Sequence, residues 1–208
     1  MKKTITLFLM LLIVSAGCKS TTDTAPVGAS ATEVTFRTTM NKLWEDHITW
    51  TRNVILNVMD NLPGLNEEVA RLQKNQDDIG DAIKPYYGDA AGEQLAALLH
   101  GHISTAADVL VAAKTGDGTG LTTAQAKWSA NADSIATFLS TANPNNWPLA
   151  DMKKMMADHL QMTTNEALAR LNKDYSGDVA AYDKVHEQIL HMADMLADGI
   201  INQFPEKF

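Results

Sequence analysis

Apolar residues recur along most of this chain at alternating spacings of three and four, which is the period of an amphipathic helix. The first long stretch shows this clearly, because Met40, Trp44, His47, Thr51 and Val54 fall on one helical face. No segment has the strict alternation of a half-buried strand. The pattern therefore predicts an all-α fold with five long helices and one shorter, broken helix. Their expected ranges are 31–61, 65–84 (the broken one), 89–114, 122–142, 148–173 and 177–203.

Local signals at the helix ends agree with this interpretation. Ser30 with Glu33, and Thr122 with Gln125, have the spacing of a capping box, and Pro63 follows a helical stretch as a stop signal. Each amphipathic helix needs neighbours to cover its apolar face, and the connecting loops are short. An antiparallel helical bundle is therefore expected.

Part of the chain is duplicated. Residues 40–53 (MNKLWEDHITWTRN) align without gaps on residues 152–165 (MKKMMADHLQMTTN), and residues 98–110 align more faintly on residues 184–196. The order of the two segments is the same in both halves, so we expect two related helical hairpins, the second more compact. A pseudo-two-fold relation between the hairpins would bring equivalent positions close together.

Three histidines fall on the apolar faces of these helices. His47 and His159 are equivalent positions of the repeat, and His102 lies on the apolar face of a third helix. Imidazole is the commonest protein ligand for transition metals, and helical bundles build such sites from facing helices. One hypothesis is that the three histidines converge on zinc, iron or copper. The other is that they are hydrogen-bonded core residues of a structural or protein-interaction module.

Further residues would assist a metal centre. The expected supporting residues are Thr51, Thr163 and Arg52, and the accessory candidates are His100, Asp183 and His186. Methionine thioethers also bind Cu(I), although methionine more generally fills irregular helical cores. The methionines concerned are Met152, Met155, Met156, Met162, Met192 and Met195.

Enzyme motifs are absent from the sequence. There is no G-x-S-x-G, no H-E-x-x-H and no phosphate-binding loop, since the stretch GDGTG (116–120) lacks the required lysine and spacing. No catalytic residue is therefore predicted.

The chain begins like a secretory signal peptide. Lys2 and Lys3 precede an apolar run from Ile5 to Val14, and small residues lead to Cys18. The apolar run is too short to span a bilayer permanently. A cysteine directly after small residues resembles the bacterial lipobox, which implies that Cys18 carries the lipid anchor after cleavage.

The sequence thus divides into a signal peptide (1–17), a lipidated cysteine with a flexible tether (18–32) and a bundle domain (33–208). Loss of Lys2 and Lys3 with the signal peptide takes the formal net charge from −8 to −10. An acidic surface repels phosphate, so nucleic acid is not an expected partner. The expected partners are a membrane, through the lipid, and an envelope protein under the second hypothesis. The expected location is the cell envelope, at the outer membrane or the periplasmic face in a Gram-negative cell.

Seven stretches that cover most of the chain after the tether carry a family resemblance. They are LWEDHITWTRNVI (43–55), KPYYG (84–88), AAKTGD (112–117), KWSANADSIATFL (127–139), DHLQMTTNEALARL (158–171), DYSGDVAAYDKVHEQILHMADML (174–196) and GIINQFP (199–205). Together they resemble a family of small, functionally uncharacterised bacterial all-helical proteins. Some members carry the names glycosyltransferase or acetylglutamate kinase, which no nucleotide-binding pattern here supports. The family's signature positions match His47, Trp50, Thr51, Arg52, His102 and His159.

Overall fold

A computed structural model describes residues 28–208 of the chain. All regular structure in this part is helical, which confirms the all-α prediction. The elements are α1 (Ala31–Asp60), α2 (Leu65–Tyr87), α3 (Asp89–Thr115), α4 (Gly118–Ala142), α5 (Leu149–Leu171), α6 (Tyr175–Gln203) and the short 3-10 helix η1 (Pro205–Lys207). The predicted signal peptide and the predicted lipidation site Cys18 lie outside the described residues.

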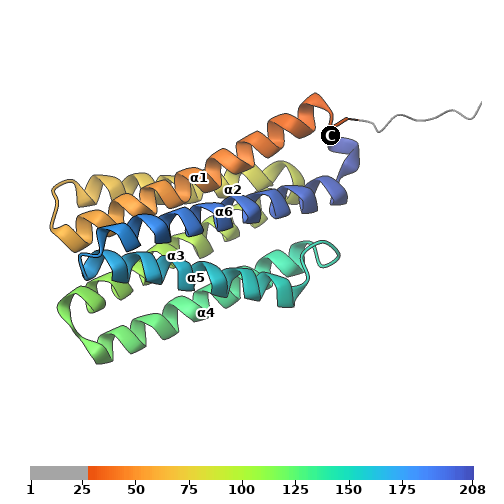
Figure 1. The fold of residues 1–208 in the computed structure, drawn as a ribbon. Coiled ribbons are helices and arrows are strands. Elements are labelled where there is room, and N and C mark those ends of the chain that lie inside the picture. The colour runs from red at the N-terminus through yellow and green to blue at the C-terminus, as the bar shows by residue number, and fades with distance from the viewer. Residues whose placement is uncertain (1–27) are drawn as a thin grey trace, which may run out of the picture.

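The six helices form a closed ring of antiparallel neighbours (Figure 1). Each helix packs against the next one in the sequence, and α6 returns to pack against α1. The start of α1 and the C-terminus therefore lie at the same end of the bundle. A ring of six helices encloses a wide interior, which side chains from all six must fill.

The interior is mostly apolar, and one side of α3 faces it. By length and composition α3 could also cross a membrane, and it is the one helix among residues 28–208 that could. In the bundle it packs against α2 and α4 and buries Leu95, Leu99 and His102.

The second helix differs from the prediction, because α2 is continuous from Leu65 to Tyr87. The polar pair Asn75 and Gln76 interrupts the apolar pattern there, but both side chains are completely buried. The amide nitrogen of Asn75 donates a hydrogen bond to the Leu43 carbonyl at 2.9 Å. The amide nitrogen of Gln76 donates to the Leu72 carbonyl at 2.7 Å, so both amide nitrogens are satisfied inside a continuous helix.

Helix capping confirms one predicted boundary and corrects another. The Ser30 side chain accepts a hydrogen bond from the backbone three residues later at 3.0 Å, as expected. Helix α4 begins at Gly118, ahead of the predicted cap Thr122, because Asp117 accepts a hydrogen bond from the Gly120 N–H at 2.9 Å. An N-cap carboxylate satisfies one of the free N–H groups at the helix start, so the helix begins there.

The duplicated segments lie differently in the two halves. In the second half they form the adjacent helices α5 and α6, which pair as a hairpin. In the first half they lie in α1 and α3, with α2 between them in the sequence. The first unit therefore spans three helices rather than two.

Helices α2 and α3 approach each other where Gly80 faces Gly92. A Cβ on Gly80 would lie 2.5 Å from the Gly92 carbonyl oxygen and 2.9 Å from the Ala96 Cβ. Neither of these atoms can rotate away. We expect Gly80→Ala to lower the free energy of unfolding by about 1–3 kcal/mol, as for other overpacked sites, measured by urea denaturation. Gly118→Ala is the control, because a Cβ there meets no atom within 4 Å.

Candidate functional site

The three predicted histidines meet in the core, and we refer to His47, His102 and His159 as the histidine layer. The ring centroids of His47 and His159 are 6.0 Å apart, and those of His102 and His159 are 6.2 Å apart. The three side chains come from α1, α3 and α5 and are at most 4% exposed. The equivalent histidines of the repeat are therefore neighbours, as the duplication predicted.

His102 has hydrogen-bonding partners at both ring nitrogens. The amide nitrogen of Asn131 donates to the Leu98 carbonyl at 3.0 Å, so the amide oxygen of Asn131 faces His102 and accepts from its Nδ1–H at 3.0 Å. Nε2 of His102 then carries the lone pair and accepts from the Trp128 indole N–H at 3.2 Å. The tautomer of His102 follows directly from these two neighbours.

His159 is oriented in the same way, but it has a hydrogen-bond partner at Nδ1 only. The amide nitrogen of Gln188 donates to the Met155 carbonyl at 3.4 Å, and its oxygen accepts from Nδ1–H of His159 at 3.1 Å. Nε2 of His159 is consequently the unprotonated nitrogen of the ring. This lone pair is available to a ligand.

His47 has an amide neighbour as well, but the pair does not form a hydrogen bond. Gln76 lies close enough to His47 to act on its pKa, and its own amide nitrogen donates to the Leu72 carbonyl at 2.7 Å. Nδ1 of His47 and Oε1 of Gln76 are both buried and have no hydrogen-bond partner. A buried polar atom without a partner is costly and is often explained by a missing ion or water.

Each histidine therefore faces a carboxamide from a different helix. Two of the amides orient the imidazole so that Nδ1 carries the proton, and all three are held through their own N–H groups by backbone carbonyls. Metal-binding histidines are typically oriented in this manner by an acceptor at the other ring nitrogen. The amide residues are Gln76, Asn131 and Gln188.

Burial keeps all three imidazoles neutral. It lowers the pKa of His102 to about 3, with a smaller contribution from His159. Burial also lowers the pKa of His159, and it holds the pKa of His47 well below its usual range, assisted by the charges that the other two rings would carry. Neutral imidazole is the form that binds metals.

A cavity of about 30 Å³ lies against the histidine layer. It borders all three histidines, and its other walls are aliphatic, tryptophan and methionine side chains. The methionines are Met40, Met156 and Met192. The cavity has no carboxylate in its lining, and its volume suits a single ion or one or two water molecules.

The residues expected to support the histidines have other roles. Thr51 donates its hydroxyl hydrogen to the backbone carbonyl of His47 at 2.7 Å. Thr163 is buried, and its hydroxyl has no partner. Arg52 forms ion pairs with Glu166 and Asp178. The amides, which the sequence did not single out, orient the rings instead.

The accessory candidates lie outside the histidine layer. Nε2 of His100 contacts Asp77 at 2.7 Å, and Nε2 of His186 contacts Glu45 at 3.2 Å, both at the half-exposed surface. Asp183 is exposed. Their position beside the apolar faces, rather than on them, places them on the outside of the bundle.

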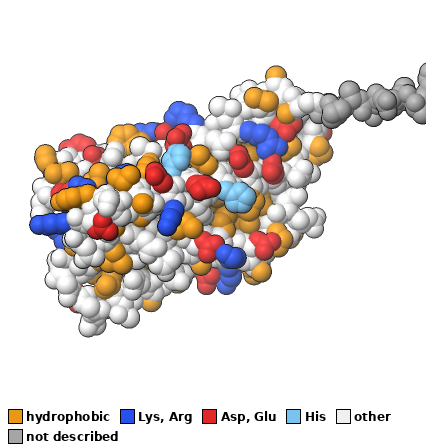
Figure 2. Space-filling model, in the orientation of Figure 1, with side chains coloured by type: hydrophobic (Ala, Val, Ile, Leu, Met, Phe, Trp, Pro, Cys, Tyr) orange, Lys and Arg blue, Asp and Glu red, His pale blue; other side chains and the backbone are white. Residues whose placement is uncertain are grey.

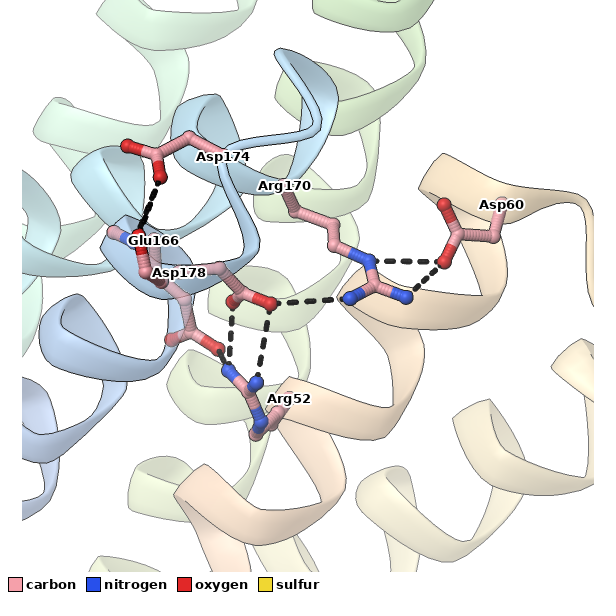
Figure 3. Close-up of polar contacts among 8 residues, drawn as sticks. Arg52, Asp60, Glu166, Arg170, Asp174 and Asp178 are labelled. Atoms are coloured by element: carbon pink, nitrogen blue, oxygen red, sulfur yellow. Dashed lines mark hydrogen bonds and ion pairs between the residues drawn. The ribbon is translucent and has the colours of Figure 1, made fainter.

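A buried ion cluster joins α1, α5 and α6 near one end of the bundle (Figure 3). The guanidinium of Arg52 donates to Glu166 at 2.7 Å and to both oxygens of Asp178 at 2.9 and 3.2 Å. Arg170 bridges Asp178, at 3.2 Å, and Asp60. Glu166 and Asp178 are 2% and 1% exposed.

Burial raises the pKa of Glu166 to about 7, and Arg52 opposes this rise. The sequence analysis did not identify Glu166 or Asp178, although a signal existed. Glu166 lies seven residues after His159 and therefore on the same helical face. An acidic residue on an apolar face, with an arginine on another, indicates a buried ion pair.

The three histidines do not form a complete metal centre in the arrangement seen here. Among residues 28–208 no three His, Asp, Glu or Cys side chains are placed to hold one ion. The only lone pair of His102 already accepts a hydrogen bond from Trp128. The three-histidine centre thus stays a prediction, and His47 and His159 are the rings free to bind.

The face of the molecule drawn in Figure 2 carries both acidic and basic side chains. On the face formed by α1, α5 and α6, basic and acidic side chains are interspersed and no broad basic field is visible (Figure 2).

No protein-family model, curated protein or solved structure matches this chain.

Proposed function

We propose that this protein is a lipid-anchored envelope protein whose bundle binds a transition metal ion at the histidine layer. One observation supports the metal site above others: three neutral imidazoles converge on a small cavity, each facing an amide from another helix. His159 offers an oriented imidazole with a free Nε2 lone pair, and His47 offers a buried ring nitrogen without a partner. His47 and His159 would be the principal ligands.

Among zinc, iron and copper, the lining favours Cu(I). The cavity is apolar and offers no anionic ligand, so a divalent ion would keep its full charge in a poorly solvating site, which is costly. A monovalent ion carries a smaller penalty. Thioethers are soft ligands that select Cu(I), and Met156 lies one helical turn before His159 on the cavity wall.

The lipid anchor belongs to the proposal as well, together with membership of the resembled family. The described chain begins at the end of the bundle that also holds the C-terminus (Figure 1). An anchor before α1 would place this end towards the membrane. The opposite end, which holds the ion cluster, would then lie farther from the membrane by the length of α1, about 45 Å for its 30 residues.

Metal binding is tested with purified protein that carries no metal-binding tag. Under anaerobic reducing conditions we expect one equivalent of Cu(I) to bind in competition with a chromogenic chelator, and zinc to bind more weakly. His47→Leu and His159→Leu should each weaken binding by about 100-fold or more, beyond the 10–100-fold typical of losing an orienting partner. Circular dichroism checks that the variants remain helical.

His191→Leu is the matched control, because His191 is exposed on α6 and should leave Cu(I) binding unchanged. Gln188→Leu removes the amide that orients His159 and should cost about 10–100-fold. Failure of the wild-type protein to bind any of the three metals, or full binding by His159→Leu, would refute the metal site.

A second candidate function is a structural or interaction module without a ligand. The complete hydrogen bonding of His102 by Asn131 and Trp128 favours it, because that ring needs no metal to be satisfied. In that case the histidine variants lose stability and no ligand is lost with them. The Cu(I) titration decides between the two functions.

A further inference from the structure

A second cavity lies one helical turn beyond the histidine layer. Its volume is about 110 Å³, and it is enclosed by α1, α3, α4 and α5. Thr51 and Thr163 line it, and each follows its histidine by four residues. Most of the wall is apolar and includes Ile55, Leu110 and Trp128.

The cavity contains one polar group that the protein does not satisfy. Thr163 is 7% exposed, and its hydroxyl has no hydrogen-bond partner. The equivalent residue of the repeat, Thr51, lines the same cavity but donates to its own helix, to the His47 carbonyl, at 2.7 Å. Threonine in a helix commonly makes this internal bond, so the free hydroxyl of Thr163 is unusual.

The lining excludes charged ligands. Its polar residues are threonines and one glutamine, Gln125, and no Asp, Glu, Lys, Arg or His borders the cavity. Gln125 and Leu168 are exposed, so the cavity opens to solvent between α4 and α5. For comparison, an apolar cavity of about 150 Å³ is known to stay dry and to bind benzene.

We propose that this cavity binds a small, uncharged, largely apolar molecule that carries a single hydroxyl group, which hydrogen-bonds to Thr163. The site is separate from the metal site and does not depend on it. Phenol is a suitable probe, and benzene is its counterpart without the hydroxyl. Trp128 connects the cavity to the histidine layer, because it lines the cavity and donates to Nε2 of His102.

The experiment follows the indole N–H resonance of Trp128 by NMR during titration of the metal-free full chain with phenol or benzene. Trp128→Phe identifies the resonance. We expect phenol to bind roughly two- to tenfold more tightly than benzene, the effect of one net hydrogen bond. Thr163→Val has nearly the same shape but no hydroxyl, and it should reverse the preference, because the phenol hydroxyl would then be buried unpaired.

Thr51→Val is the matched control, since that hydroxyl already has a partner, and it should keep the preference for phenol. Benzene binding by Thr163→Val shows that the variant is folded and its cavity intact. The proposal is overturned if neither probe binds the wild-type protein at millimolar concentration, or if the wild-type protein binds benzene as tightly as phenol. It is equally overturned if the two valine variants behave alike.

Discussion

Lowering the pH from 7 to 5 is expected to destabilise the folded protein strongly through its buried histidines. The pKa of His102 is about 3 in the folded state, against an ordinary value of 6.5 in the unfolded chain. Between these values only the unfolded chain takes up the proton, so stability is lost as the pH falls below 6.5. At pH 5 the loss from His102 alone is about 2 kcal/mol, at 1.36 kcal/mol per pH unit. His47 and His159 have lowered pKa values too, and each adds a loss of the same sign.

Glu166 acts in the opposite direction. Its folded pKa of about 7 lies above the ordinary value of 4.5, so the folded state takes up its proton first. Protonation of Glu166 therefore stabilises the bundle as the pH falls from 7 towards 4.5, and it offsets about one histidine. With three histidines against one glutamate, the net effect of acid is destabilising.

Urea denaturation at pH 7, 6 and 5 measures this balance. His102→Gln should flatten the pH dependence, because one proton is no longer taken up on unfolding. Glu166→Gln should steepen it, because the opposing group is gone. An exposed histidine serves as the control, and His191→Gln should leave the slope unchanged. Equal slopes in the wild-type protein and in His102→Gln would show that His102 is not buried as a neutral ring.

The sequence predicted the helices and the histidine layer for the same reason, since both depend on periodicity along one helix. His47 and His159 were found because each occupies a position where the spacing calls for an apolar residue, and the duplication marks the two as equivalent. Closing six helices into a ring then brings these faces together. A pattern within one element is thus sufficient to place a residue in the core.

The amides could not be predicted in this way. Asn131 lies 29 residues from His102, and Gln188 lies 29 residues from His159. Which polar residue at the edge of an apolar face meets a histidine depends on the rotation and crossing of two packed helices. That information is not contained in the spacing of residues along either helix.

Arg52→Met is expected to lower the free energy of unfolding by about 3–5 kcal/mol. The guanidinium of Arg52 is the partner of two carboxylates, Glu166 and Asp178, which are almost completely buried. Removing one member of a buried ion pair leaves the opposite charge in a poorly solvating site, and losses of this size are typical. Methionine retains most of the aliphatic length of arginine, so the loss of packing is small. Urea denaturation at pH 8.5, where Glu166 with its pKa of about 7 is ionised in the wild-type protein, measures the change.

The matched control is Lys42→Met in the same helix, where an exposed lysine pairs with Asp46 at 2.6 Å. That pair is screened by solvent, and its loss should cost less than about 1 kcal/mol. The double variant Glu166→Gln with Arg52→Met should lose clearly less free energy of unfolding than the sum of the two single variants. In the double variant no unpaired charge is left at position 166, because glutamine is neutral. Asp178 keeps its second partner, Arg170, in both backgrounds. If Arg52→Met cost no more than Lys42→Met, the buried ion pairs of Arg52 would contribute no more to stability than a solvent-exposed one.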